Sequence, residues 1–157
     1  FYFFDYNRPE CIALNPIVEK LAEECDDLKV ILVDYPIGTD MSAFASTVAI
    51  AASFQNKYLI VHNSLMTSKH YLAYKDQVLD IAKPSGINMK ILGTKIDKGI
   101  PNALLNTNLV LGKENGIRDV PYFLICYSKP PYSAEVFIEN DKTGATVKKY
   151  LYKFSQN

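Results

Sequence analysis

Cysteine and histidine are the side chains of this 157-residue chain best suited to nucleophilic, redox or metal chemistry. Cys11 has the most informative surroundings. An aromatic strand, Phe1 to Tyr6, leads into a turn, Pro9 stands where a helix would begin, and Cys11 falls in the first helical turn. Proline is favoured at the first helical position because its missing N–H has no partner there in any case. Residues 1–11 therefore have the layout of an entry to a redox site.

The cysteine count is three, which leaves at least one thiol without a partner in the chain. Cys11 and Cys25 fall on one predicted helix, about 21 Å apart at 1.5 Å per residue, which is far beyond disulfide reach. We expect Cys25 and Cys126 to be buried core residues, as free cysteines usually are.

Other chemistry has little support. His62 and His70 have no cysteine or carboxylate partners at metal-ligand spacing, so surface or helix-packing roles are expected. Neither a metal nor a cofactor is predicted, and the sequence has no Gly-rich phosphate loop. The 17 basic and 17 acidic residues balance, which argues against nucleic acid as a partner. No apolar run reaches the roughly 20 residues of a membrane span. The sequence shows no signal peptide, but Phe1 already lies within a predicted strand, so this says nothing about export.

The length predicts one domain with a proper core. Residues 1–6 and 29–35 read as buried strands. Between them an apolar stripe at helical spacing starts after Pro9 and contains Pro16. Strand, helix and strand in this length make a right-handed βαβ unit with parallel strands.

The middle of the chain, residues 39–116, is predicted to be helical throughout. Two strands, at 120–127 and 134–139, then form a hairpin before a final helix. Helices are expected at about 39–54, 57–67, 71–82, 88–97 and 101–115, the last ended by Gly116. Segments 1–38 and 117–157 thus form one α/β part, interrupted by a helical insertion at 39–116.

Several short stretches, in this order, resemble the DsbA-like branch of the thioredoxin fold family. Phe3-Phe4-Asp5-Tyr6 resembles the strand before the family's Cys-x-x-Cys, and Cys11 with Pro16 resembles its second cysteine and helix proline. Asp34-Tyr35-Pro36-Ile37 resembles the exit of the second strand. The run from Lys113 to Ile125 resembles the loop, cis-proline and strand that face the redox site, with Pro121 as the cis-proline. The resemblance implies an α/β thioredoxin fold with an inserted helical subdomain.

The resemblance also implies an altered site. The family attacks with the first thiol and resolves the mixed disulfide with the second. Here Arg8 stands at the attacking position, and Cys11 is the remnant resolving thiol, our one catalytic candidate. Tyr2 occupies the place of a buried acid that aids proton transfer. We therefore expect lost oxidase activity.

The remaining site residues are predicted to bind a partner. Arg8, Pro9 and Glu10 should form one side of a shallow groove, and Val120 and Pro121 the other. The expected partner is a protein or extended polypeptide, and the resemblance suggests a periplasmic or otherwise exported setting, such as an envelope assembly.

Two alternatives stay open on the sequence alone. One is a monothiol oxidoreductase or a glutathione-handling enzyme similar to the kappa-class transferases. The other is an active oxidase in which position 8 has been altered.

Overall fold

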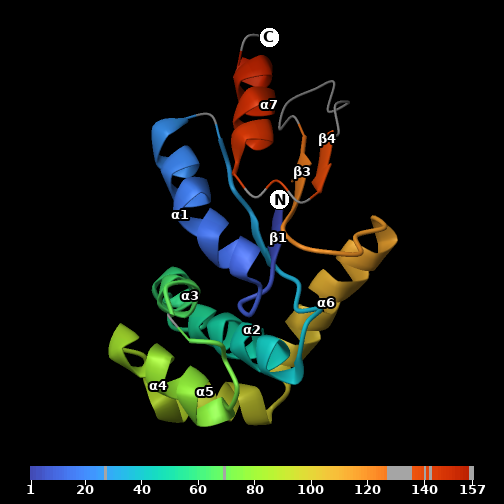
Figure 1. Ribbon diagram of the computed structural model, residues 1–157. Helices are drawn as coiled ribbons and strands as arrows, with labels where there is room; N and C mark the ends of the chain where they lie inside the picture. Colours follow the sequence, from blue (N-terminus) through green and yellow to red (C-terminus); the bar gives the residue numbers. More distant parts are fainter. Residues whose placement is uncertain (27, 69, 127–135, 140, 142, 156–157) are drawn as a thin grey trace.

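The computed structural model describes residues 1–157 except 27, 69, 127–135, 140, 142, 156 and 157 (Figure 1). The elements run in the order β1 (Tyr2–Phe4), α1 (Pro9–Glu24), β2 (Leu32–Asp34), α2 (Asp40–Ser53), α3 (Tyr58–Met66), α4 (Lys75–Ala82), a 3₁₀ turn (Lys83–Ser85), α5 (Met89–Asp97), α6 (Ile100–Glu114), β3 (Tyr122–Ile125), β4 (Val136–Glu139) and α7 (Ala145–Ser155).

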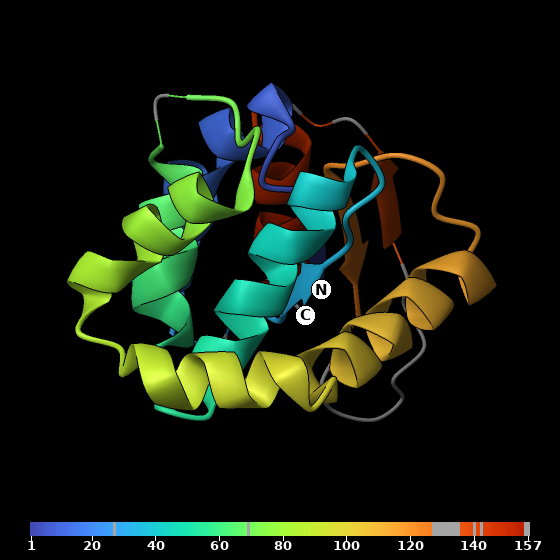
Figure 2. The ribbon, with the colours of Figure 1, turned by 90° about the horizontal axis from the view of Figure 1, so that it is seen from below.

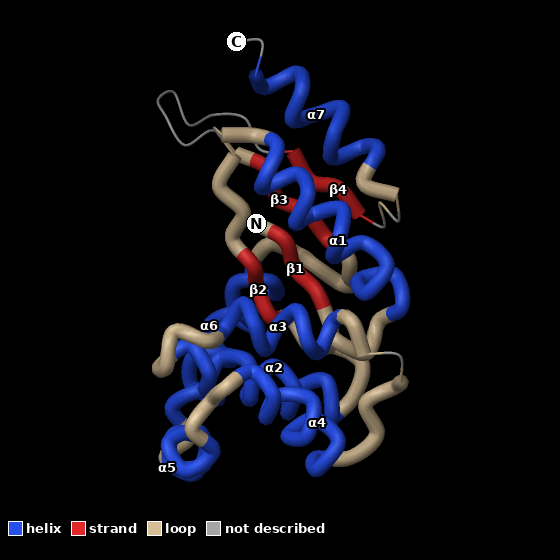
Figure 3. Tube along the Cα trace, turned by 90° about the vertical axis from the view of Figure 1, so that its left-hand side faces the viewer, coloured by secondary structure: helices blue, strands red, loops and turns tan. Residues whose placement is uncertain are grey.

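The described strands form one sheet in the order β2-β1-β3-β4. β1 pairs with β2 in parallel and with β3 in antiparallel, and β4 completes an antiparallel hairpin with β3. Helices α1 and α7 lie over one face of this sheet, as Figure 3 shows, and α2 to α6 gather beyond one end of it. This is the predicted fold class, a thioredoxin-like α/β fold with an inserted helical region.

Aromatic side chains of β1 build the centre of the sheet. Tyr2, Phe3 and Phe4 are all buried. The Tyr2 ring stacks on Phe123 of β3 with 4.7 Å between centroids, and Phe3 packs edge-on against Tyr35 at 5.8 Å. Offset stacked and edge-to-face pairs stabilise such contacts beyond the area that they bury. These three residues therefore fix the strand that leads into the candidate site.

The helical insertion is organised around α2, which is rich in alanine and packs against α3, α4, α5 and α6 (Figure 2). Small side chains let neighbouring helices approach closely. The Thr39 hydroxyl caps α2 by accepting the Ser42 N–H at 3.1 Å.

Helix α6 ends in a way that aims the chain toward β3. Gly116 has a φ of +70°, a conformation that glycine adopts without strain. The Gly116 N–H donates to Lys113 O at 3.1 Å, and the Ile117 N–H donates to Gly112 O at 2.9 Å. This pair of bonds is a Schellman motif, so the predicted stop at Gly116 is confirmed.

Several predicted boundaries were wrong. β1 and β2 are shorter than expected, because the chain turns after Asp5 and because the regular pairing of β2 with β1 starts only at Leu32. Helix α4 begins at Lys75 and not at residue 71. The preceding backbone is held by side chains instead, since Ala73 N–H donates to Gln77 Oε1 at 2.9 Å. The connection of the predicted hairpin falls at residues 127–135, outside the described chain.

Candidate functional site

The two segments predicted to flank the site are joined by one ion pair. Arg8 is the residue before α1, and its Nη2 lies 3.2 Å from Asp119 Oδ1. The same Asp119 oxygen accepts the Val120 N–H at 3.0 Å. The Val120–Pro121 peptide bond is cis. The structure therefore places the start of α1 beside the loop before β3.

The five residues of this candidate binding surface differ in exposure. Pro9 is exposed, Arg8 and Glu10 are half-buried, and Val120 and Pro121 are buried. On the side formed by Val120 and Pro121, the side chains are buried, so a partner would contact mainly the backbone. The bridge between Arg8 and Asp119 lies across it.

Asp5 holds the turn from which the site starts. Its Oδ1 accepts the Asn7 N–H at 2.7 Å, and its Oδ2 accepts the N–H groups of Ile37 and Gly38, both at 3.0 Å. A buried carboxylate that accepts several backbone N–H groups is held by strong, charge-assisted bonds. Asp5 therefore locks the exit of β1 to the exit of β2. The sequence interpretation gave Asp5 no role, although an acid directly after a buried strand was a usable signal.

Asn7 attaches the helical insertion to the same turn. Its Oδ1 accepts the Leu72 N–H at 2.8 Å, and its Nδ2 donates to Leu72 O at 2.9 Å. The two bonds imitate a strand pair and keep residues 71–74 extended. Tyr71 and Tyr74 in this segment are each more than 60% exposed. Two aromatic rings therefore face solvent close to Arg8, a feature that sequence reasoning missed.

Cys11 is fully buried in the first turns of α1. Burial raises the pKa of its thiol to about 12, and the carboxylates of Asp5 and Glu10 add to the increase. Hydrogen bonds from the Asp5 backbone and the Tyr2 hydroxyl oppose it without reversing it. Tyr2 also donates its hydroxyl to Cys11 O at 3.3 Å. Cys11 is thus a protonated thiol at neutral pH and a poor nucleophile.

The prediction that the other two cysteines are buried was wrong. Cys25 is only half-buried, because α1 ends at Glu24 and Cys25 already leaves the helix. Cys126 is exposed, because it lies one residue beyond the last pair of the β3–β4 ladder. All three thiols are free.

A buried polar cluster joins the thioredoxin part to the insertion. Tyr58 of α3 donates its hydroxyl to Asp34 Oδ2 at 2.6 Å, at the end of β2. Burial raises the pKa of Asp34 to about 6, and the Tyr58 bond opposes this. The sequence analysis placed Asp34 only at the exit of the second strand. It did not identify Tyr58 as a partner, because the two residues are far apart in the sequence.

His62 has a helix-packing role, one of the two roles that the sequence left open. It lies in the core, with Nδ1 3.0 Å from the Tyr6 hydroxyl and Nε2 2.9 Å from Asn15 Oδ1. The neutral ring satisfies both contacts when Nε2 carries the proton and donates to the amide oxygen. Burial lowers the pKa of His62 to about 4. His62 is therefore neutral at physiological pH and links α3 to α1.

Metal binding and membrane crossing find no support in the described part of the chain. It contains no cluster of three or more histidine, cysteine or acidic side chains that could hold a metal ion. Its helices are too short or too polar to cross a membrane.

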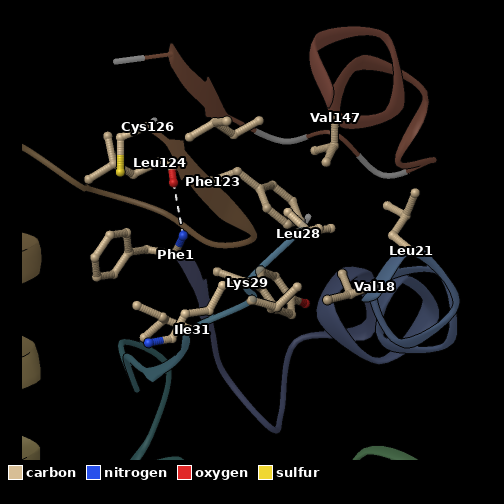
Figure 4. Close-up of a pocket in the computed structure, with 13 residues that line it drawn as sticks. Phe1, Val18, Leu21, Leu28, Lys29, Ile31, Phe123, Leu124, Cys126 and Val147 are labelled. Atoms are coloured by element: carbon tan, nitrogen blue, oxygen red, sulfur yellow. Dashed lines mark hydrogen bonds between the residues drawn. The ribbon is translucent and has the colours of Figure 1, made fainter. Parts of the chain in front are cut away.

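An apolar pocket of about 300 Å³ opens at the opposite end of the sheet from Arg8 (Figure 4). Residues of β1, β3, α1 and α7 line it, among them Phe1, Leu21, Phe123 and Val147. The Phe1 amino group donates to Leu124 O at 2.9 Å at its edge. Because it borders the start of β1 and not its end, this pocket is separate from the candidate binding surface.

Several solved bacterial structures are similar to this chain. A thioredoxin-like oxidoreductase from Silicibacter pomeroyi DSS-3 superposes with a TM-score of 0.77 and 26% identity, over 96% of this chain and 84% of that one. The thiol-disulfide exchange protein alpha-DsbA2 from Wolbachia pipientis gives 0.70 and 25%, over 77% and 66% of the two chains. The catalytic domain of Proteus mirabilis ScsC gives 0.68 and 25%, over 96% and 81%.

These matches establish a thioredoxin-like fold with the helical insertion seen in DsbA structures. No protein-family model matches the sequence, and no curated protein is significantly similar to it.

Proposed function

We propose that this chain is a DsbA-like protein that has lost dithiol oxidase activity and binds extended polypeptide at the candidate binding surface. One observation carries the proposal. Arg8, which carries no sulfur, stands before α1, and the nearest sulfur along the chain, Cys11, is buried with a pKa of about 12.

Disulfide exchange requires a thiolate that can reach a disulfide and a second thiol that resolves the intermediate. Cys11 meets neither the charge nor the access requirement of the first role. The monothiol alternative needs a reactive sulfur at the same place, so the burial of Cys11 counts against it too.

The surroundings of the surface favour a polypeptide partner. The Val120 backbone can pair with an added extended strand, and Tyr71 and Tyr74 supply exposed aromatic area on the insertion side. Aromatic residues are enriched at the centres of protein interfaces. Without a covalent bond, a lasting complex should bury roughly 1,200–2,000 Å². We therefore expect the partner to contact the insertion as well as the residues around Arg8.

An exported setting fits this role. One structural match, at 22% identity, is described as a periplasmic thioredoxin-like protein from Salmonella enterica serovar Typhimurium. By analogy, we propose that this chain acts in the cell envelope, in an assembly or on extended protein segments.

The test has an activity arm and a binding arm. In the first, the protein should reduce insulin and oxidise model dithiol peptides no faster than buffer, whereas an active thioredoxin-fold oxidase serves as the positive control. In the second, a permanently unfolded, carboxymethylated polypeptide should shift the backbone amide resonances of residues near the surface, namely Arg8, Glu10, residues 71–74, Asp119, Val120 and Tyr122. Turnover comparable with that of the control, or shifts confined to the apolar pocket of Figure 4, would overturn the proposal.

A further inference from the structure

We propose that the surface selects extended segments carrying an acidic side chain, which displaces Asp119 from Arg8. The inference deepens the proposed function and rests on it. Asp119 acts in this view as an internal substitute for the ligand, and Arg8 is the specificity-determining residue.

The contacts of Asp119 are those that a bound peptide would need. A strand added beside Val120 must place a carbonyl oxygen on the Val120 N–H, which now donates to Asp119 Oδ1 at 3.0 Å. The same Oδ1 binds Arg8 Nη2 at 3.2 Å. Asp119 Oδ1 therefore engages both groups that a peptide would use, the Val120 N–H and the Arg8 guanidinium. A peptide can reach Val120 only after the Asp119 side chain moves away.

The ion pair between Arg8 and Asp119 can be broken at little cost in free energy. The side chain of Asp119 is 52% exposed and that of Arg8 is 38% exposed. Exposed ion pairs contribute little to stability, typically about 0–1 kcal/mol. The bridge also engages Arg8 through Nη2 alone, while Arg8 Nε is buried and has no hydrogen-bond partner. A competing ligand thus loses little by breaking it.

A ligand carboxylate would use Arg8 more fully than Asp119 does. Nε–H and one Nη–H of a guanidinium point in parallel and match the two oxygens of a carboxylate. Once Asp119 is displaced and the Arg8 side chain turns toward the ligand, such a bidentate contact would give the now buried Nε a partner, while the ligand backbone takes over the Val120 N–H. A neutral segment would gain only the backbone bond and would leave Arg8 unpaired. Acidic segments should therefore bind more tightly than neutral ones.

The probe is a set of fluorescein-labelled decapeptide pools, each with one central residue fixed as Asp, Glu, Asn, Gln or Lys and the others randomised without cysteine. Fluorescence anisotropy measures binding to the full chain at low and moderate salt. The Asp and Glu pools should bind about tenfold more tightly than the Asn and Gln pools, a difference equivalent to about 1.4 kcal/mol. This preference should weaken as salt rises.

Variants assign the preference to the bridge. Arg8→Gln should reduce it to within about twofold, and Arg8→Glu should favour the Lys pool. Asp119→Asn should tighten binding of neutral and acidic pools alike, because the internal competitor loses its charge. Arg118→Gln removes an adjacent exposed cation and serves as the matched control, which should keep the preference. Circular dichroism verifies that each variant is folded.

The outcomes separate the two proposals. Binding of all pools with no acidic preference, or a preference that Arg8→Gln leaves intact and Arg118→Gln removes, overturns the role of Arg8 and Asp119 while polypeptide binding stands. Absence of binding from every pool overturns the proposed function and this inference with it.

Discussion

Replacing Asp34 with asparagine should change how the stability of the protein depends on pH. Asp34 is buried at the end of β2, where it accepts the Tyr58 hydroxyl from the helical insertion at 2.6 Å. Burial penalises the charged carboxylate and raises its pKa from 3.8 to about 6. An asparagine side chain can accept the same hydroxyl and does not titrate.

The sign and size follow from linkage between proton binding and folding. In the unfolded chain Asp34 loses its proton near pH 3.8, and in the folded chain near pH 6. Between these values the folded state binds more protons, so the Asp34 contribution to stability is present below pH 3.8 and is lost as pH rises to 6. A pKa difference of this size corresponds to about 3 kcal/mol. The unfolding free energy of Asp34→Asn minus that of the unchanged protein should therefore rise by about 2 kcal/mol between pH 4 and pH 6, and by about 3 kcal/mol between pH 3 and pH 7.

Urea unfolding followed by far-UV circular dichroism at several pH values measures this difference directly. The contribution of His62, whose lowered pKa acts in the opposite direction, is common to both proteins and largely cancels. Tyr58→Phe is the matched control. It removes the hydrogen bond that favours the carboxylate, so the titration of Asp34 should move above pH 6. A difference that stays flat from pH 4 to pH 7 would show that Asp34 does not titrate as its burial implies.

Three further predictions concern the thiol and the packing. Native alkylation of Cys11 at pH 8, followed by peptide mass spectrometry, should be at least about a thousandfold slower than in the unfolded chain, because its pKa is raised from 9.0 to about 12; rapid native labelling would contradict its burial. Arg8→Cys should permit a disulfide to Cys11 but give only feeble insulin reduction, because no acid stands at position 2 to handle protons; turnover at oxidase rates would refute this. Gly112→Ala should destabilise the protein by about 1–3 kcal/mol, because the added Cβ meets the Tyr35 ring. The control Gly93→Ala, in open space on α5, should stabilise it slightly, and equal effects at the two glycines would refute the packing argument.

The fold was predictable because its signals are local and repeated. Short aromatic or β-branched runs marked the strands, helical spacing marked α1, and Gly116 marked the end of α6. Predicted helix boundaries were wrong where side-chain hydrogen bonds hold the backbone in a conformation that the hydrophobic pattern does not indicate. Residues 71–74 look like part of a helix, but Asn7 holds the Leu72 backbone in an extended form.

For the candidate site, the sequence predicted which segments lie close together but not the contacts between their side chains. The resemblance predicted that Arg8 and Val120 lie on opposite sides of one groove. In the structure both residues contact the side chain of Asp119. The distant partners of Asp5 and Asp34 could not be predicted from the sequence, because these contacts join residues more than 20 positions apart. The prediction that Cys126 is buried was wrong. It rested on the usual burial of cysteine, and the sequence did not show that the β3–β4 pairing ends at Ile125.

The shape of the candidate surface does not depend on a thiol at position 8. Asp5 supplies acceptors to three backbone N–H groups, Asn7 fixes the insertion, and the α6 terminus aims the loop that carries Asp119. A buried N–H left without an acceptor costs about 1–3 kcal/mol, so these contacts determine whether the surface forms. Arg8, at the position where the resemblance places the attacking thiol, supplies no such acceptor through its side chain, which carries only donors. Under the proposed function, recognition of an extended chain is therefore separable from thiol exchange, and a chain without the attacking thiol can keep the surface on which such a partner would lie.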